Sequence, residues 1–184
     1  MSECSFVNYC APTLAGIKTG SLFSCDCTSK NELILEIRQY NKILVPKGLK
    51  LLPVRLQNNK ALIYLYRPDM LKSDLNDSLA AYLLKSCGYN LENCNCCVVQ
   101  LVKRLQENDN FPHEIGLFLG YPPEDVYGFI KNPRQGCKYT GTWKVYGDVY
   151  KAKQIFDSYN KCTKNYNNRL AMGHTIEQLI VSDL

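Results

Sequence analysis

One stretch of the chain, LKLLPVRLQNNKALIYLYRP at residues 49–68, has the pattern of a β-hairpin. Two apolar, strand-like runs flank Asn58-Asn59-Lys60, and asparagine tolerates the positive φ angles of a tight turn. Pro53 removes a ladder donor, so we expect the first strand either to lie at a sheet edge or to start after this residue. A hairpin joins antiparallel neighbours, which argues against a doubly wound parallel sheet. The sequence therefore predicts an α+β fold with a mixed or antiparallel sheet and a central hairpin.

Apolar residues at helical spacing predict four or five helices packed around this hairpin. Start and stop signals support them, such as the Thr28-Ser29 cap before the first helix and Gly88 after the second. Thr175 and Gln178 would form a capping box for a last short turn. The expected helices cover residues 28–44, 69–87 and about 92–107, a short segment opened by Pro122-Pro123, and a long segment from near Asp148 onward.

Three other segments are expected not to be helical. Residues 1–27 should be irregular or short-stranded, because CAPTLAGIKTGSLF is too rich in Gly, Pro and Thr for a helix interior. Residues 113–119 should form a strand, since branched apolar residues occupy every second position from Ile115 to Leu119. A further strand is expected through YTGTWKVYG, residues 139–147.

Length and composition favour a single cytoplasmic domain spanning residues 1–184. No basic segment followed by an unbroken apolar stretch opens the chain, so we expect no secretory signal, and no apolar run reaches the roughly 18 residues of a membrane span. The ten cysteines are then expected to be reduced thiols. The net charge is +5, but basic residues are mixed with acidic ones, which argues against nucleic-acid binding.

Four motifs resemble those of a family of small cytoplasmic proteins from anaerobic Gram-positive bacteria, catalogued only as a domain of unknown function. The resemblance runs from about Ser5 to Leu179, and the motifs are distinctive in combination. They are CAPTLAGIKTGSLF (10–23), YRPDML (66–71), FPHEIGLFLGYPPEDVYGFI (111–130) and WKVYGD (143–148).

The resemblance implies no activity, because the family has none assigned. Some members are associated with flavodoxin genes, so the resemblance implies a flavodoxin-like redox partner or a redox cofactor as candidates. The cysteines at positions 25, 27, 94, 96 and 97 do not belong to the family pattern. Seven polar residues match it position by position: Cys10, Lys18, Arg67, His113, Glu114, Lys144 and Asp148.

Cys10 is the candidate nucleophile. A reactive thiol needs a cation or a base that lowers its pKa. Lys18 and His113 are candidates for that work, and Glu114 or Asp148 would orient the imidazole. The alternative is that Cys10 is a small buried hydrophobic residue, as most cysteines outside disulfides are.

His113 is the candidate catalytic base, because it is one of only two histidines and precedes a predicted strand. His174 follows Gly173 and precedes a capping threonine, which indicates a surface turn. The alternative is that His113 is a structural residue that bonds a carbonyl or an acid and faces away from the Cys10 loop. If it is a base, His113 should share one concave site with Cys10 and Lys18.

The candidate metal ligands are the cysteines of Cys25-x-Cys27 and of the Cys94, Cys96 and Cys97 group, since four thiolates could hold zinc or an iron–sulfur cluster. Helical periodicity instead places Cys97 on a buried face, so we predict no metal site. A thioredoxin-like role for Cys94-x-x-Cys97 is also disfavoured, since a helix rather than a strand precedes it.

Candidate ligand-binding residues stand at predicted strand ends. Arg67 ends one strand, while Lys144, Tyr146 and Asp148 lead from another strand into a helix. The two basic residues would grip a carboxylate or phosphate near a helix N-terminus. The alternative makes Asp148 a helix cap and Lys144 a solvated side chain, with Trp143 or Tyr146 in the core.

Two function classes therefore stay open, and the cofactor is unknown. The first is a thiol-dependent enzyme that uses Cys10 and His113 on a small anionic or acyl-like substrate. The second is a non-catalytic protein that binds a small molecule, a redox cofactor or a flavodoxin-like redox partner. The absence of Walker and dinucleotide glycine motifs argues against a bound nucleotide.

Overall fold

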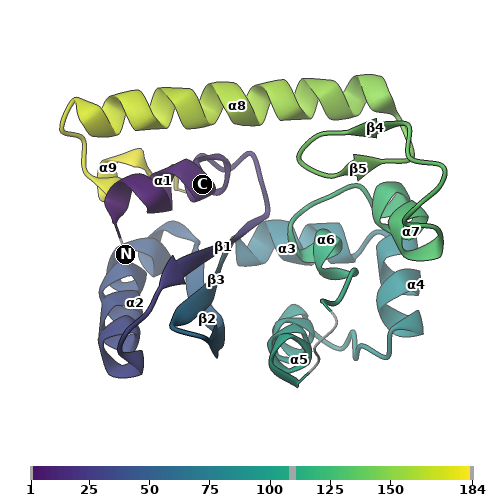
Figure 1. The fold of residues 1–184 in the computed structure, drawn as a ribbon, viewed down its shortest axis with the longest axis horizontal. Helices are drawn as coiled ribbons and strands as arrows, with labels where there is room; N and C mark the ends of the chain where they lie inside the picture. The colour runs from purple at the N-terminus through teal and green to yellow at the C-terminus, as the bar shows by residue number, and fades with distance from the viewer. Residues whose placement is uncertain (1, 108–110, 183–184) are drawn as a thin grey trace. The chain divides into compact units, whose positions relative to one another are not determined.

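The computed structural model describes residues 2–107 and 111–182 (Figure 1). Its internal contacts divide the chain into two compact units. Unit 1 comprises Met1–Asp69 and Lys161–Leu184, and unit 2 comprises Met70–Asn160. The single domain expected from the chain length stays a prediction, and each unit is described by itself.

The sheet of unit 1 confirms the predicted hairpin and the α+β class. Strands β1 (Gly20–Asp26), β2 (Lys50–Gln57) and β3 (Lys60–Tyr66) are antiparallel and lie in the order β1-β3-β2. The turn residues Asn58 and Asn59 have φ angles of 52° and 57°, in the left-handed region that asparagine tolerates. As expected, Pro53 lies in an edge strand, next to a register shift between Pro53 and Arg55.

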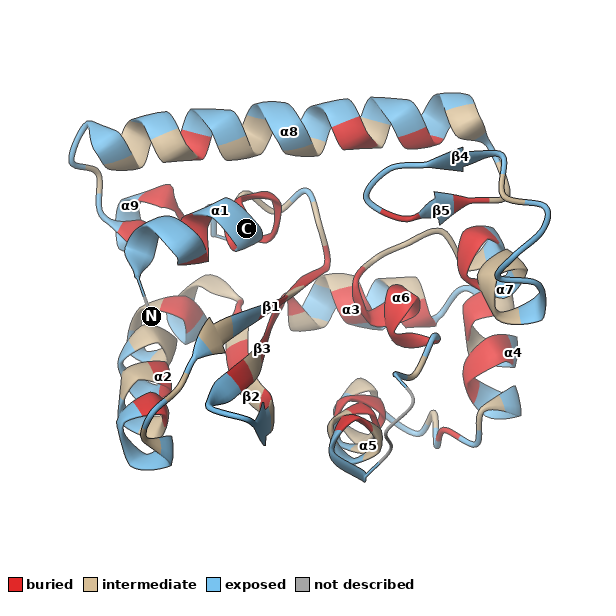
Figure 2. Ribbon diagram, in the orientation of Figure 1, coloured by how far each residue is buried: buried red, intermediate tan, exposed pale blue. Residues whose placement is uncertain are grey.

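Helices cover this sheet and enclose the core of unit 1 (Figure 2). Helix α1 (Glu3–Leu14) contacts β1, and α2 (Lys30–Leu44) contacts β2. The short helices η1 (Val45–Lys47) and α9 (Ile176–Leu179) complete the unit, together with the second half of α8 (Val149–Ala171). The capping box of α9 forms as predicted between Thr175 and Gln178.

The expectation of an irregular segment at residues 1–27 was wrong over α1. Ser2 caps this helix by accepting a hydrogen bond from the backbone N–H of Ser5 at 3.2 Å. The helix breakers gather at its end, where Pro12 occupies the last turn and Gly16 adopts a φ of +74°. The burial of an apolar face that includes Phe6 and Leu14 outweighs the weak helix propensity of the later residues.

Unit 2 is mainly helical. The segment predicted as one helix over 69–87 is two helices, α3 (Pro68–Leu75) and α4 (Ser78–Ser86). Asp77 causes the break, because its side chain accepts hydrogen bonds from the N–H groups of Leu79 and Ala80 at 2.8 and 3.0 Å. Helices α5 (Cys94–Glu107) and α7 (Pro123–Lys131) agree with the predicted ones.

The predicted strand at 113–119 is wrong, since the structure has the short helix α6 (Ile115–Phe118) there. All residues from Ile115 to Leu119 are buried, so no alternation between an inner and an outer face exists. Gly116 is explained by the packing of α6 against α7 and not by a strand, because a side chain at this position would not fit. A Cβ atom at this position would lie 2.7 Å from Val126 of α7 and 3.2 Å from Tyr121.

The strand predicted through residues 139–147 is a small hairpin. Its strands β4 (Tyr139–Thr140) and β5 (Lys144–Val145) are antiparallel. The backbone N–H of Gly141 closes the turn by donating to the carbonyl of Trp143 at 3.0 Å. The first half of α8 packs Ala152 and Phe156 against Trp143 and Val145 of this hairpin.

Candidate functional site

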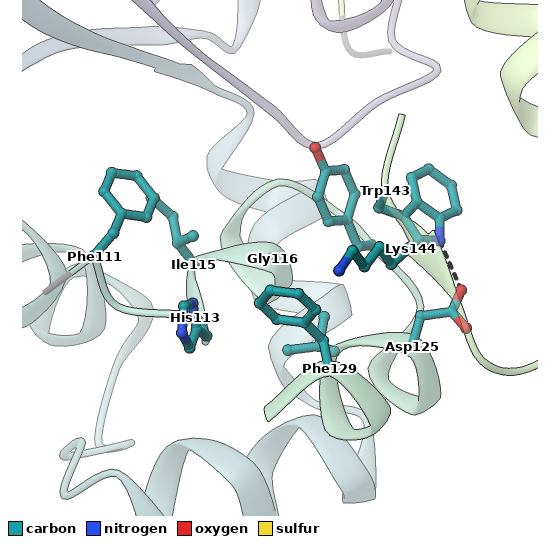
Figure 3. A pocket seen from close by; sticks show the side chains of 10 residues that line it. Phe111, His113, Ile115, Gly116, Asp125, Phe129, Trp143 and Lys144 are labelled. Atoms are coloured by element: carbon teal, nitrogen blue, oxygen red, sulfur yellow. Dashed lines mark hydrogen bonds between the residues drawn. The ribbon is translucent and has the colours of Figure 1, made fainter. Parts of the chain in front are cut away.

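An apolar pocket of about 290 Å³ opens in unit 2 between α6, α7 and β5 (Figure 3). Both units contain other hollows, but the lining of this one is the more aromatic, with two basic side chains beside Phe, Tyr and Trp rings. The loop before α6 contributes Phe111 and His113, and β5 contributes Lys144. The full lining is Phe111, His113, Ile115, Gly116, Tyr121, Asp125, Val126, Phe129, Trp143 and Lys144.

Aromatic rings form the walls of this pocket. The rings of Tyr121 and Trp143 stack with their centroids 4.8 Å apart and their planes inclined by 28°. The His113 ring stands edge-on to Phe129 at 4.9 Å. Phe111 leaves 43% of its surface exposed, although solvent contact is unfavourable for a phenyl ring. The walls therefore suit a flat apolar group better than a strongly hydrated one.

Two basic side chains stand at the pocket. The Lys144 ammonium donates a hydrogen bond to the carbonyl of Pro133 at 2.9 Å and lies 5.4 Å from the centroid of the Phe129 ring. Lys144 and His113 are both exposed, and Phe129 lies between them in Figure 3. The structure thus brings together at one pocket two of the residues that the sequence motifs indicated.

Asp125 fixes the indole side of the pocket. Its carboxylate is buried and accepts three hydrogen bonds of 2.7 Å, from Nε1 of Trp143 and from the backbone N–H groups of Tyr146 and Gly147. It also lies in the first turn of α7, where the helix dipole favours a negative charge. This role has no local sequence signal, because the hydrogen bonds join α7 to residues about twenty positions later in the chain.

Glu114, the predicted partner of His113, turns away from this pocket. Its side chain is buried, accepts a hydrogen bond from the Tyr89 hydroxyl at 3.1 Å and forms an ion pair with Arg104 at 3.4 Å. Arg104 also lies 4.6 Å from the centroid of the Tyr89 ring. Burial, followed by the Glu114 charge, raises the pKa of Tyr89 well above its usual value. This network ties α5 to α6.

The residues of WKVYGD have mainly structural contacts. Asp148 caps α8, since its carboxylate accepts a hydrogen bond from the backbone N–H of Lys151 at 3.0 Å. The Tyr146 hydroxyl donates to the carbonyl of Asn132 at 3.2 Å. Its ring also covers Gly128, where a Cβ atom would collide with it. Neither residue lines the apolar pocket, so their predicted role in ligand binding has no support from that site.

Cys10 and Lys18 lie in unit 1, and their charges interact. Cys10 is fully buried in α1, and this burial raises its pKa well above the usual range despite the opposing effect of the Lys18 ammonium. Burial also lowers the pKa of Lys18 to about 8. The electrostatic interaction between the two residues is consistent with the predicted proximity of Lys18 to Cys10. The full burial of Cys10 nevertheless disfavours the reactive thiolate.

Arg67 is also in unit 1 and is fully buried. Its Nε donates to the carbonyl of Thr13 at 2.7 Å, and its Nη2 donates to the carbonyls of Leu14 and Val181 at 2.9 and 2.6 Å. The guanidinium thus joins the end of α1 to the C-terminal segment. These contacts argue for a structural role rather than for the predicted capture of an external anion.

The predicted pairing of Cys10 with His113 stays a prediction, because the two residues belong to different units. The cysteine groups considered for metal binding are divided in the same way, with Cys25 and Cys27 in unit 1 and the cysteines of α5 in unit 2. Over the described residues, no cluster of three or more His, Cys, Asp or Glu side chains has a geometry that would hold a metal ion. None of the helices in these residues is both long and apolar enough for a membrane span.

The fold and this site define an α+β protein with an aromatic pocket in its helical unit. The chain matches the family model described as Protein of unknown function (DUF3793) over residues 6–180, and it belongs to that family. Comparison with curated proteins gave no match, and neither did comparison with solved structures. The family membership predicted from the sequence motifs is therefore confirmed.

Proposed function

We propose that this protein is a non-catalytic binding protein for a small, flat ligand with an apolar ring system and one anionic group. The observation that carries the proposal is the joint presence of aromatic walls and two basic side chains, His113 and Lys144, at one pocket. Aromatic faces favour stacking with a flat ring. The Lys144 ammonium would pair with a carboxylate, phosphate or sulfonate at the rim.

The size of the pocket supports a small ligand. Its volume of about 290 Å³ lies just below the roughly 300–1,000 Å³ that is typical of small-molecule sites. Asp125 supports this assignment indirectly, because it holds the Trp143 ring in place before a ligand arrives. Such preorganisation reduces the entropy that binding costs.

A flat redox cofactor is the narrower form of this proposal. Flavin mononucleotide carries a planar ring system and a phosphate, and these are the two features that the aromatic walls and Lys144 would recognise. A flavodoxin-like partner would exchange electrons with such a cofactor. Flavin mononucleotide requires neither of the glycine motifs whose absence argued against a bound nucleotide, so it is a useful first ligand beside simpler aromatic acids.

The thiol-dependent enzyme has weaker support. Cys10 is fully buried, and burial raises its pKa, which leaves little thiolate near neutral pH. One observation favours the thiol-dependent enzyme: the positive charge of Lys18 lowers the pKa of Cys10, in opposition to burial. The binding protein is therefore the better-supported function.

Equilibrium titration tests the proposal with two probes, flavin mononucleotide and 8-anilinonaphthalene-1-sulfonate. Trp143 is the only tryptophan, so ligand binding at the pocket should quench its fluorescence. Lys144→Gln should weaken the affinity about tenfold or more, since a charge-assisted hydrogen bond contributes about 1.5–3 kcal/mol. Lys161→Gln, at an exposed lysine of α8 in unit 1, is the matched control and should leave the affinity unchanged. Equal affinities for both variants would contradict the assigned role of Lys144.

A further inference from the structure

We propose that Cys94 and Cys97 form a second site, a dithiol that exchanges with disulfides by forming a reversible bond across the first turn of α5. Both cysteines line one pocket of about 220 Å³ in unit 2. No residue lines both this pocket and the aromatic pocket. The proposal is independent of the ligand proposed above.

The N-terminus of α5 places the two cysteines. Asn93 caps this helix, because its side-chain oxygen accepts a hydrogen bond from the backbone N–H of Cys96 at 2.9 Å. Its carbonyl accepts a weaker hydrogen bond from the backbone N–H of Cys97 at 3.4 Å. Cys94 is therefore the first helical residue, and Cys97 begins the next turn on the same side.

The spacing of the pair suits an intramolecular disulfide. Residues three apart on a helix have Cβ atoms about 5–6 Å apart, whereas a disulfide needs about 3.5–4.5 Å. The first turn must therefore tighten by about 1–2 Å. This is feasible at a helix end, where the backbone N–H groups have no intrahelical partners. Cys96 is two residues from Cys94 and faces another direction, so it is the poorer partner.

The surroundings give the two thiols different roles. Cys94 is half-buried and sits in the first turn, where the helix dipole stabilises a thiolate. Cys97 is only 2% exposed, and its thiol donates to the carbonyl of Asn90 at 3.3 Å. Lys72 and Glu92 also line the pocket, and their opposite charges act on the Cys94 thiolate in opposite senses. Cys94 is accordingly the attacking thiol and Cys97 the resolving thiol.

The exchange balances with a disulfide, written RSSR, as the oxidant. The Cys94 thiolate attacks one sulfur of RSSR, so that a mixed disulfide forms and an RS⁻ thiolate leaves. Cys97 then loses its proton to that thiolate and attacks the Cys94 sulfur. The products are the Cys94–Cys97 disulfide and two RSH in total, with the second proton taken from water. Two electrons pass from the dithiol to RSSR.

The site does not require a thioredoxin-like fold. Sequence analysis disfavoured that role because a helix precedes the two cysteines, and α4 does precede them in the structure. The chemistry depends on the local arrangement, which is a capped helix start with two thiols in one pocket. That arrangement is present at α5.

The test uses glutathione disulfide on the full chain. After incubation, remaining thiols are alkylated in denaturant, and cleavage after Glu92 and Glu107 releases a peptide of residues 93–107 that holds Cys94, Cys96 and Cys97. In the wild-type protein this peptide should carry one alkyl group, on Cys96, and should be lighter by two hydrogens. In Cys96→Ser the peptide should again be lighter by two hydrogens, and it should carry no alkyl group. In Cys97→Ser the glutathione adduct should accumulate on Cys94.

The exposed Cys4 provides an internal control for oxidation. If Cys4 carries glutathione while Cys94 and Cys97 are fully alkylated, the dithiol site does not exist. A disulfide that joins either residue to Cys96 or to Cys87 would also overturn the proposal. Circular dichroism of each variant checks its folding.

Discussion

Nε1 of Trp143 donates a 2.7 Å hydrogen bond to Oδ2 of Asp125, a carboxylate that is buried in the first turn of α7. The same carboxylate accepts hydrogen bonds from the backbone of Tyr146 and Gly147, so a single side chain joins the β4–β5 hairpin to α7. The aromatic pocket lies along this junction. Its shape therefore depends on Asp125.

Asp125→Ala should lower the free energy of unfolding by about 3 kcal/mol or more, because three donors lose their acceptor and each unpaired buried group costs about 1–3 kcal/mol. Urea denaturation followed by Trp143 fluorescence measures this loss. The control is Glu124→Ala, which removes an exposed acid from the same helical turn and should cost less than about 1 kcal/mol. Similar losses for the two variants would show that only the helix dipole is involved.

Arg67→Lys should destabilise the protein although it keeps the positive charge. A lysine ammonium cannot reproduce the planar arrangement that binds the carbonyls of Thr13, Leu14 and Val181, so buried acceptors lose their donors. We expect a loss of about 2–4 kcal/mol in the free energy of unfolding. Arg38→Lys, at an exposed position of α2, is the control. Equal stability of the two variants would be inconsistent with the anchoring role of Arg67.

Lys18 predicts a pH dependence of stability. Burial lowers its pKa from 10.5 to about 8 in the folded protein, so the unfolded chain binds more protons between these values. The free energy of unfolding should therefore increase as the pH rises from about 8 towards 10.5, and below pH 8 the buried Lys18 charge lowers it. The test compares chemical denaturation of Cys10→Ala with that of Cys10→Ala/Lys18→Met, because Cys10 titrates with the opposite effect. A stability difference that stays constant with pH would refute the shift.

Cys10 should be the slowest cysteine to react with iodoacetamide near pH 7, and it should react well after the exposed Cys4. Both the lack of solvent access and the raised pKa of Cys10 oppose alkylation. Peptide mass spectrometry over a time course measures each rate. If Cys10 reacted before Cys4, the thiol-dependent enzyme would become the leading function.

The elements that sequence analysis predicted correctly have local signals. The hairpin follows from its two asparagines, α2 from the Ser29 cap, and α9 from a capping box within four residues. α6 could not be predicted in this way, because a short helix buried on all sides has no amphipathic period. α1 was missed because its helix-breaking residues are conspicuous, whereas the burial that stabilises it arises from distant strands.

The candidate site was predicted only in part. His113 and Lys144 were selected from their motifs, and they do line one pocket. Glu114 was selected for its position beside His113, but its partners Tyr89 and Arg104 come from other segments. Asp125 was not among the selected residues, because nothing near it in the sequence indicates its three hydrogen-bond donors. Such non-local pairings decide which polar residues are structural.

Nuclear magnetic resonance of the Trp143 indole N–H tests the central proposal most directly. The protein has one tryptophan, so one indole signal reports on the pocket wall. During titration with flavin mononucleotide or 8-anilinonaphthalene-1-sulfonate, this signal should shift and saturate, and the shift should need more ligand in Lys144→Gln. An indole signal that stays fixed while amide signals elsewhere shift would place binding outside this pocket and contradict the account.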